Sequence, residues 1–362
     1  MLYHLLYPLT KYFSALNLFR YITFRTAGAT ATAIIICLIL GPFFINMLKR
    51  YQVAEKIREE GPATHKKKAG TPTMGGLIVL AGIVIPTLLW ANLSNFYIQL
   101  ILLVTVWLGA IGFMDDYLKA IKNQRRGLVA RKKMIGQILL GLLFGLALVY
   151  LMPGDYYDGT TGIPFFKNYV LYLGILYVPF IIAVITGSSN AVNLTDGLDG
   201  LAIGLCGLSF FAFGGIAYLT GRLDYSNYLQ IDYLPGTGEL TIFCGAAVGS
   251  ALGFLWFNSH PAEVFMGDTG SLSLGGALGA IAIVLKKELL LLIVGGVFVI
   301  TALSVIIQVL SYRYRGGKRV FKMAPLHHHF ELIGWHESKI VVRYWILGAL
   351  FALLTLATLK IR

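Results

Sequence analysis

Residues 98–116 read IQLILLVTVWLGAIGFMDD, a long apolar run without a charge that ends in two adjacent aspartates. A transmembrane helix needs about 20 predominantly apolar residues, so this stretch predicts a membrane span with two carboxylates at its end. Similar runs recur along the chain, which favours an all-α polytopic membrane protein with about ten transmembrane helices. We expect these spans near 24–48, 73–91, 98–116, 134–152, 170–187, 198–219, 240–257, 270–285, 289–311 and 341–359.

The composition agrees with a membrane protein. The 362 residues are 57% hydrophobic and 13% charged, whereas soluble domains carry roughly 25% charged residues. Because no stretch is long and polar enough to fold separately, residues 1–362 are expected to form a single membrane domain. Residues 1–20 lack the pattern of a cleaved signal peptide and predict an interfacial helix. The three cysteines lie in apolar runs without C-x-x-C spacing and predict no disulfide or metal role.

Lys and Arg are unevenly distributed between the loops. Seven fall in each of 49–72, 117–133 and 313–343, which is 21 of the 30 in the chain. The positive-inside rule places these segments in the cytoplasm, and with ten spans both termini then face outward. The cytoplasmic loops are expected near 49–72, 117–133, 188–197, 258–269 and 312–340. The net charge of +13 fits this bias, anionic substrates and lipid headgroups better than nucleic acid.

The first candidate site is the pair Asp115 and Asp116 at the end of the third expected span. Adjacent residues on a helix point roughly 100° apart, so the two carboxylates cannot serve one target equally. One of them could bind or orient a ligand while the other abstracts a proton. The alternative is a solvated helix end that stops the span.

The second candidate site is the segment NAVNLTDGLDG at 190–200. Asn190, Asn193, Asp196 and Asp199 recur every three residues, which on a helical turn makes one polar stripe. Amide and acid side chains on one face suit the hydroxyls and amides of a nucleoside or sugar. The alternative is a polar loop whose Asn and Asp residues cap helices.

The third candidate site is FMGDTGS at 265–271, just before the eighth expected span. Asp268 could hold Mg²⁺, which prefers one or two carboxylates together with substrate phosphates and water. The alternative is a helix N-cap. Phe265 could stack on a base or simply be buried.

The fourth candidate site is the run MAPLHHHFE at 323–331, in a basic loop. In an extended segment His327 and His329 would share one side, with His328 on the other. A zinc site is possible, but the usual gaps between zinc ligands are missing. We prefer contact with phosphate or carbohydrate for these histidines.

The fifth candidate site is KKKAGTPTMGG at 66–76, where three cations precede the start of a helix. This arrangement forms a plausible anion site that includes Lys68. It lacks the spacing of a P-loop, so ATP binding is not supported. The alternative is a flexible loop followed by close helix packing.

Taken together, the order and wording of these five motifs resemble the phospho-N-acetylmuramoyl-pentapeptide transferases over nearly the whole chain. This family belongs to the polyprenyl-phosphate N-acetylhexosamine-1-phosphate transferase superfamily. The resemblance implies that UDP-N-acetylmuramoyl-pentapeptide reacts with undecaprenyl phosphate, giving lipid I and UMP at the cytoplasmic membrane of a bacterium. A homodimer is implied by the same resemblance only.

The resemblance also implies roles for individual residues. The essential aspartates match Asp115, Asp116 and Asp268, and Asp268 matches the magnesium ligand. His327 falls at or beside the active site. The uridine-contacting positions match Lys68, Asn193, Asp196, Leu198, Asn258 and Phe265.

The mechanism expected from these roles is attack by an oxygen of the lipid phosphate on the β-phosphate, with UMP leaving. Asp115 would take a proton from the lipid phosphate. Mg²⁺ on Asp268 would stabilise the leaving oxygens, and Asp116 would orient the lipid phosphate or the cation. A two-step route through an aspartyl-phosphate stays open.

Two other classes of function and one related enzyme compete with this prediction. A transporter would place acids near mid-span and repeat its halves, whereas these acids lie at span ends and no repeat is evident. A structural membrane protein would not need clustered acids on one side. A sibling transferase that uses UDP-GlcNAc is the rival within the superfamily.

Overall fold

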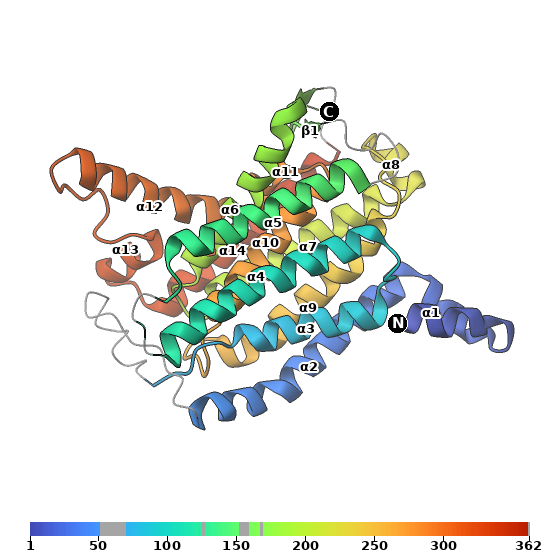
Figure 1. Cartoon of the computed structure of the whole chain (residues 1–362), viewed down its shortest axis with the longest axis horizontal. Coiled ribbons are helices and arrows are strands. Elements are labelled where there is room, and N and C mark those ends of the chain that lie inside the picture. The colour runs from blue at the N-terminus through green and yellow to red at the C-terminus, as the bar shows by residue number, and fades with distance from the viewer. Residues whose placement is uncertain (51–69, 123, 125–126, 152–158, 167–168, 361–362) are drawn as a thin grey trace.

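The computed structural model describes residues 1–50, 70–122, 124, 127–151, 159–166 and 169–360. Nearly all of this chain is helical, and most of the long helices run side by side in one bundle (Figure 1). The long helices are α2 (Ile22–Arg50), α3 (Gly76–Trp90), α4 (Phe96–Ala120), α5 (Ala130–Leu151), α6 (Tyr177–Thr195), α7 (Leu201–Thr220), α9 (Leu240–Asn258), α10 (Gly267–Val284), α12 (Gly296–Tyr314) and α14 (Glu337–Thr358).

Short elements precede the first of these helices or lie between the others. They are α1 (Leu2–Leu6), η1 (Tyr7–Lys11), η2 (Ser14–Arg20), β1 (Thr160–Gly162), β2 (Val170–Tyr172), η4 (Gly174–Leu176), α8 (Leu223–Leu229), η5 (Thr237–Glu239), α11 (Glu288–Val294) and α13 (Leu326–Ile333). The strands β1 and β2 pair in an antiparallel hairpin, with Thr161 opposite Leu171.

Nine helices in the described part of the chain are long and apolar enough to cross a membrane. The expected span at 73–91 corresponds to α3, which has 15 residues and is the short member of the set. The polytopic membrane fold expected from the sequence is therefore confirmed. About ten helices of the bundle match the ten expected spans.

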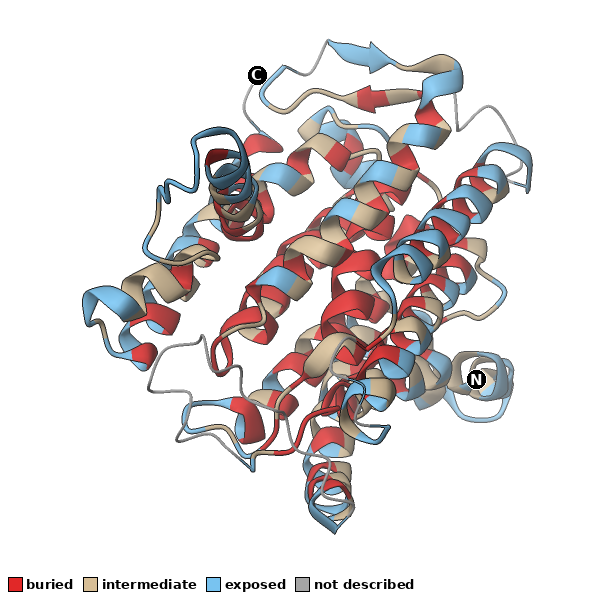
Figure 2. Ribbon diagram, turned by 60° about the vertical axis from the view of Figure 1, so that its left-hand side comes forward, coloured by how far each residue is buried: buried red, intermediate tan, exposed pale blue. Residues whose placement is uncertain are grey.

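Helix α10 forms the centre of the bundle and is almost entirely buried (Figure 2). It packs against α4 and α6, and its small residues let these neighbours come close. A side chain at Gly275 would meet backbone atoms of Ser188 and Ser189 on α6. Because α10 begins at Gly267, this packing fixes the position of Asp268 against the ends of α4 and α6.

Several expected boundaries are wrong. Helix α6 continues to Thr195, so 188–197 is not a loop, and the expected span 170–187 begins in β2 rather than in a helix. Residues 1–20 form three short helices instead of one. The expected span 289–311 is broken at Gly295 into α11 and α12.

The histidine run at 327–329 lies in the helix α13, so the shared side that an extended segment would give His327 and His329 does not arise. Pro325 precedes α13, a position where proline readily starts a helix, and Gly334 ends it in a left-handed conformation. The three histidine side chains consequently point in successive directions around a helix.

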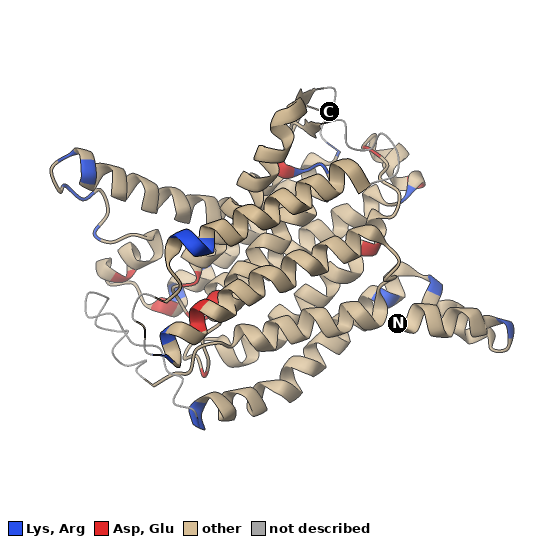
Figure 3. Cartoon of the chain, in the orientation of Figure 1, with Lys and Arg blue, Asp and Glu red and all other residues tan. Residues whose placement is uncertain are grey.

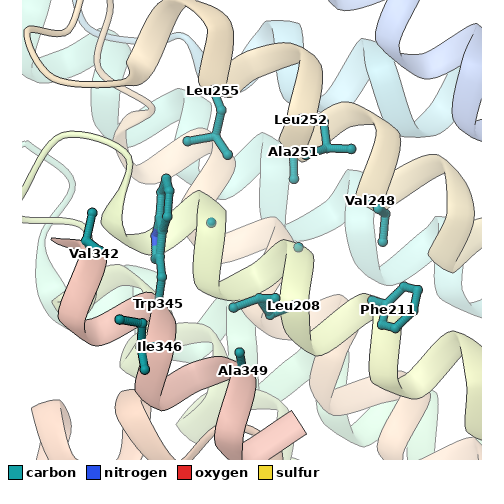
Figure 4. A pocket seen from close by; sticks show the side chains of 12 residues that line it. Leu208, Phe211, Val248, Ala251, Leu252, Leu255, Val342, Trp345, Ile346 and Ala349 are labelled. Carbon is teal, nitrogen blue, oxygen red and sulfur yellow. The ribbon is translucent and has the colours of Figure 1, made fainter. Parts of the chain in front are cut away.

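An apolar groove of about 480 Å³ lies between α7, α9 and α14 (Figure 4). Trp345 of α14 lines it and donates a hydrogen bond from Nε1 to the carbonyl of Gly200, at 3.3 Å. A side chain at Gly204 would overlap the Trp345 ring. Helix α14 is thereby attached to the turn that precedes α7.

The end of the bundle opposite Asp268 contains a buried carboxylate, Glu288. Thr161 Oγ1 and Tyr177 Oη each donate to it at 2.5 Å, which ties the β hairpin to α6 and α11. Burial raises the pKa of the Glu288 carboxyl above its ordinary value, although these two hydroxyl donors oppose the shift.

The raised pKa of Glu288 predicts a pH-dependent contribution to stability. A carboxyl whose folded-state pKa is raised stabilises the fold fully below its unfolded value of 4.5 and loses this contribution as pH rises through the folded value. Melting temperatures of the purified protein, measured from pH 4 upward, should therefore fall more steeply for the wild type than for Glu288→Gln. The exposed Glu263→Gln is the control and should follow the wild type. Equal slopes in all three proteins would contradict this prediction.

Candidate active site

The segment 72–76 is joined by backbone hydrogen bonds to the segment that precedes Asp268. Phe265 N donates to Pro72 O at 2.9 Å, and Gly75 N and Gly76 N donate to Phe265 O and Met266 O, each at 2.8 Å. A side chain at Gly76 would meet the backbone of Gly270. The start of α3 therefore holds the start of α10 in place.

Asp116 caps the first turn of α10. Its Oδ1 accepts from Asp268 N at 3.0 Å, and its Oδ2 accepts from Thr269 N at 2.9 Å and from Thr269 Oγ1 at 2.6 Å. The side chain is buried. Because Asp116 occupies the capping role, the interpretation of Asp268 as an N-cap is wrong. The expectation that Asp116 and Asp268 lie at the same end of the bundle is confirmed.

Asp115 and Asp268 contact the same two lysines. Lys119 Nζ lies 2.6 Å from Asp115 Oδ2 and 3.2 Å from Asp268 Oδ2. Lys133 Nζ lies 2.8 Å from Asp268 Oδ2 and 3.8 Å from Asp115 Oδ2. Figure 3 shows acidic and basic residues close together where α4 ends and α5 begins. Two carboxylates from different helices are thus gathered around one small volume.

The other oxygen of each of these two carboxylates is held by a neutral donor. Asp115 Oδ1 accepts from Leu128 N at 2.6 Å, and Asp268 Oδ1 accepts from Asn193 Nδ2 at 2.7 Å. The Oδ2 atoms therefore both face the lysine ammonium groups. Two converging carboxylate oxygens are hard ligands, so this donor set fits Mg²⁺ completed by phosphate and water.

The residues expected to form a polar stripe take different positions. Asn190 and Asn193 lie on α6, where Asn190 Nδ2 donates to Gln137 Oε1 at 2.8 Å and Asn193 Nδ2 also donates to Ser271 Oγ at 2.8 Å. Asp196 is the C-cap of α6, and Asp199 lies in the turn beyond it. The stripe is therefore limited to the two asparagines, and Asn193 joins it to Asp268.

Asp199 lies within a second cluster of titratable side chains. Its Oδ2 lies 3.0 Å from His260 Nδ1 and accepts from Ala262 N at 3.2 Å, and its backbone N donates to Glu337 Oε1 at 2.8 Å. The Glu337 and His260 side chains are 3.4 Å apart. Although one atom of each residue converges within 4.8 Å, these atoms bind one another or the backbone. We assign this cluster to holding the turn at 197–200 and not to binding a metal.

Asn258 links the same turn to the segment that precedes α10. Its Oδ1 accepts from Gly200 N at 3.1 Å, and its Nδ2 donates to Val264 O at 2.8 Å. Gly200 has a φ of 75°, which glycine adopts without strain. Leu198 is buried in this turn. Phe265, the residue after Val264, is half-buried.

The three histidines of α13 contact different neighbours. His327 is fully buried, and its ring occupies the space that a side chain at Gly197 would need. His328 Nδ1 lies 2.7 Å from Glu331 Oε2, and His329 Nδ1 accepts from Lys322 N at 3.1 Å. The structure thus brings His327 to the turn at 197–200, whereas His328 and His329 bind within their own segment.

Several known proteins are similar in sequence to this chain over its full length. Residues 98–286 match the family model "Glycosyl transferase family 4", and residues 68–80 match "Phospho-N-acetylmuramoyl-pentapeptide-transferase signature 1". Proteins named phospho-N-acetylmuramoyl-pentapeptide-transferase from Pelobacter propionicus and Desulforapulum autotrophicum are 54% identical to the chain, and one from Thermodesulfovibrio yellowstonii is 52% identical. Each alignment covers 100% of both proteins.

The chain belongs to the phospho-N-acetylmuramoyl-pentapeptide-transferase family. The resemblance stated from the motifs is confirmed. The family signature at 68–80 includes the segment that pairs with the backbone before Asp268. Lys68, the first residue of this signature, lies outside the described residues.

Several site residues of this family member were not singled out from the sequence. Lys119 and Lys133 were seen only as members of basic loops, although Lys119 lies four residues after Asp115, a spacing that places it on the same helix face. Thr269 and Ser271 lie in the FMGDTGS segment with Asp268, but the sequence assigned no role to either. Gln137, His260 and Glu337 gave no local signal, because their contacts depend on how distant helices pack.

Proposed function

We propose that this protein transfers phospho-N-acetylmuramoyl-pentapeptide from UDP-N-acetylmuramoyl-pentapeptide to undecaprenyl phosphate, giving lipid I and UMP. The observation that carries the proposal is the convergence of Asp115, Asp116 and Asp268 at one end of the bundle, in a chain 54% identical to proteins named for this activity. The bilayer supplies the lipid substrate, and no nucleic acid takes part.

The nucleotide sugar would bind beside the acids, along the end of α6 and the turn at 197–200. Support comes from Asn193, which joins this region to Asp268, and from the buried His327 against Gly197. We place the substrate-binding residues, which either contact the substrate or hold the segments that do, at Lys68, Asn190, Asn193, Asp196, Leu198, Asp199, Asn258, Phe265, His328 and His329. Of these, Asn258 and Asp199 act by holding the turn, because their polar atoms bind backbone groups there.

Asp115 and Asp268 would together hold Mg²⁺, with Asp268 as the principal ligand. When bound, Mg²⁺ neutralises charge on the diphosphate and on the oxygens of the leaving UMP. Asp116 keeps the Asp268 backbone at the site through the capping bonds of α10. In this proposal Asp116 is a positioning residue, and it contacts neither the lipid phosphate nor the cation.

In the reaction that we propose, an oxygen of the lipid phosphate attacks the β-phosphorus and the bond to the UMP oxygen breaks. Asp115 accepts the proton of the lipid phosphate if that phosphate arrives as a monoanion, since its second pKa is roughly 6 by analogy with other phosphomonoesters. His327, beside the turn, orients the bound nucleotide sugar. Catalysis then rests mainly on positioning and on charge neutralisation.

The acid cluster would face the cytoplasm. In the expected topology it lies on the same side of the membrane as the three segments richest in Lys and Arg, and the positive-inside rule makes that side cytoplasmic. Both termini would then face outward from a bacterial cytoplasmic membrane. A homodimer fits the family and is part of the same proposal.

One assay separates the candidate functions. Purified protein is supplied with labelled UDP-N-acetylmuramoyl-pentapeptide and undecaprenyl phosphate, with and without Mg²⁺, and UMP and labelled lipid are measured. We expect both products in equal amounts and only with the divalent ion. UMP release only when UDP-GlcNAc replaces the muramoyl nucleotide would favour the sibling transferase. The absence of both products with either nucleotide would reject a transferase.

Glu337→Gln tests the turn at 197–200. The Glu337 side chain accepts from Asp199 N and lies beside His260, so its loss should loosen the turn and weaken nucleotide binding. One weakened hydrogen bond predicts a KM for the nucleotide sugar raised roughly five- to tenfold, with kcat nearly unchanged. The exposed Glu263→Gln is the control. A large drop in kcat with an unchanged KM would contradict the positioning role.

A further inference from the structure

We propose that Lys133, assisted by Lys119, is a built-in cation that occupies the divalent-metal position between Asp115 and Asp268 and is displaced when the metal binds. The displaced ammonium groups then bind the diphosphate of the substrate. This inference rests on the proposed function, because it assumes that these two acids form the metal site.

The first observation is that both ammonium groups lie between the same two carboxylate oxygens. Each Nζ is within 4 Å of Asp115 Oδ2 and of Asp268 Oδ2, at distances from 2.6 to 3.8 Å. Asp115 and Asp268 are largely shielded from solvent, with side chains 4% and 14% exposed. Two shielded carboxylates repel each other strongly unless cations lie between them, so the lysines keep the pair assembled.

The second observation is that the two lysines come from different helices. Lys119 lies in the last turn of α4 and Lys133 in the first turn of α5. The other oxygen of each carboxylate is bound by Leu128 N or Asn193 Nδ2, neither of which needs to move when the lysines leave. The carboxylates are thus held in position by one set of contacts and neutralised by another.

A metal ion and the two ammonium groups cannot share this volume. Mg²⁺ binds oxygen at about 2.0–2.1 Å and keeps several waters, which would overlap an ammonium group 2.8 Å from Asp268 Oδ2. Like charges also repel. Lysine has a flexible four-carbon stem and three donors, so its ammonium can swing to a phosphate that enters with the metal. Binding of the metal and rearrangement of the lysines are therefore one event.

This exchange predicts opposite effects on metal binding and on turnover. In Lys133→Met a competing cation is gone, so Mn²⁺ binding in the absence of nucleotide, followed by electron paramagnetic resonance, should tighten on the order of tenfold. Turnover at saturating metal should fall on the order of a hundredfold, because the diphosphate loses a charge-assisted partner. A residue that only supports the fold would not strengthen metal binding.

Lys132→Met is the matched control. Lys132 is the neighbouring residue on α5, it is exposed, and its substitution removes the same charge from the same helix. We expect its Mn²⁺ affinity to equal that of the wild type. If Lys133→Met does not fold, Lys119→Met provides the same test, because Lys119 contacts both carboxylates.

The outcomes separate the two proposals. Unchanged or weaker Mn²⁺ binding in Lys133→Met, together with normal binding in the wild type and loss of binding in Asp268→Asn, would overturn the cation exchange alone. Mn²⁺ binding that is as tight in Asp268→Asn as in the wild type would overturn the proposed metal site itself. An equal gain of affinity in Lys132→Met would reduce the effect to net charge and would also overturn the exchange.

Discussion

Asp268→Asn is expected to lower turnover on the order of 10³-fold while the protein stays folded. The substitution keeps the size of the side chain and an oxygen that can accept from Asn193 Nδ2. It removes the charge that faces Lys119 and Lys133 and, in our proposal, holds Mg²⁺. Loss of one preorganised charge-stabilising group commonly costs two to three orders of magnitude in rate.

The measurement is UMP release at saturating substrates over a range of Mg²⁺ concentrations, with Mn²⁺ binding as a second readout. Asp224→Asn is the control, because Asp224 is an exposed acid in α8 that pairs with Arg222. We expect weaker metal binding in Asp268→Asn and wild-type behaviour in Asp224→Asn. Wild-type turnover of Asp268→Asn at ordinary magnesium would reject Asp268 as the metal ligand.

The two-step mechanism has its own test. An aspartyl-phosphate route requires the phosphosugar to bind covalently to an aspartate before the lipid attacks. Incubation with labelled nucleotide sugar in the absence of lipid, followed by denaturation, would then leave label on Asp115 or Asp268. Direct attack predicts unlabelled protein under the same conditions.

The sequence predicted the membrane bundle well because its signal is local. Each span is a run of apolar residues whose length alone matches the bilayer, and the acids that end these runs are visible in the same stretch. The boundaries were less certain where polar residues continue a helix. Asn190 and Asn193 look like a loop in the sequence, yet they lie on α6 because its polar side chains bind Gln137 and Asp268 from neighbouring helices.

The roles within the acid cluster could not be predicted in the same way. Asp115 and Asp116 are neighbours with the same side chain, and only the packing of α4 on α10 decides that Asp116 caps a helix while Asp115 meets the lysines. The cluster of Asp199, His260 and Glu337 joins residues that are up to 138 positions apart. Contacts over such separations leave no trace in a single sequence.

The packing that separates these roles predicts a second large effect, from Gly112→Ala on α4. A side-chain carbon at Gly112 would lie 2.5 Å from the backbone carbon of Asp268 and 2.6 Å from the Cα of Thr269. Neither atom can rotate away, because both belong to the first turn of the buried helix α10. The substitution must therefore move α4 away from α10.

Such a movement would stretch the bonds from Asp116 to Asp268 N and Thr269 N, and would separate Asp115 from Asp268. Overpacking of a tight interface typically costs about 1–3 kcal/mol, so we expect a lower melting temperature. Turnover should fall on the order of a hundredfold or more, because a displacement of about 1 Å near a reacting centre can have that effect.

Gly187→Ala on α6 is the matched control, since it makes the same chemical change in another long helix of the bundle. Gly187 is exposed and no atom lies within 4 Å of the added carbon, so alanine should leave turnover unchanged and stabilise the helix by up to about 1 kcal/mol. Wild-type melting and turnover in Gly112→Ala would mean that the contact between α4 and α10 does not position Asp268. A lower melting temperature in Gly112→Ala together with a higher one in Gly187→Ala would instead show that the position of the acids depends on the close approach of the α4 and α10 backbones.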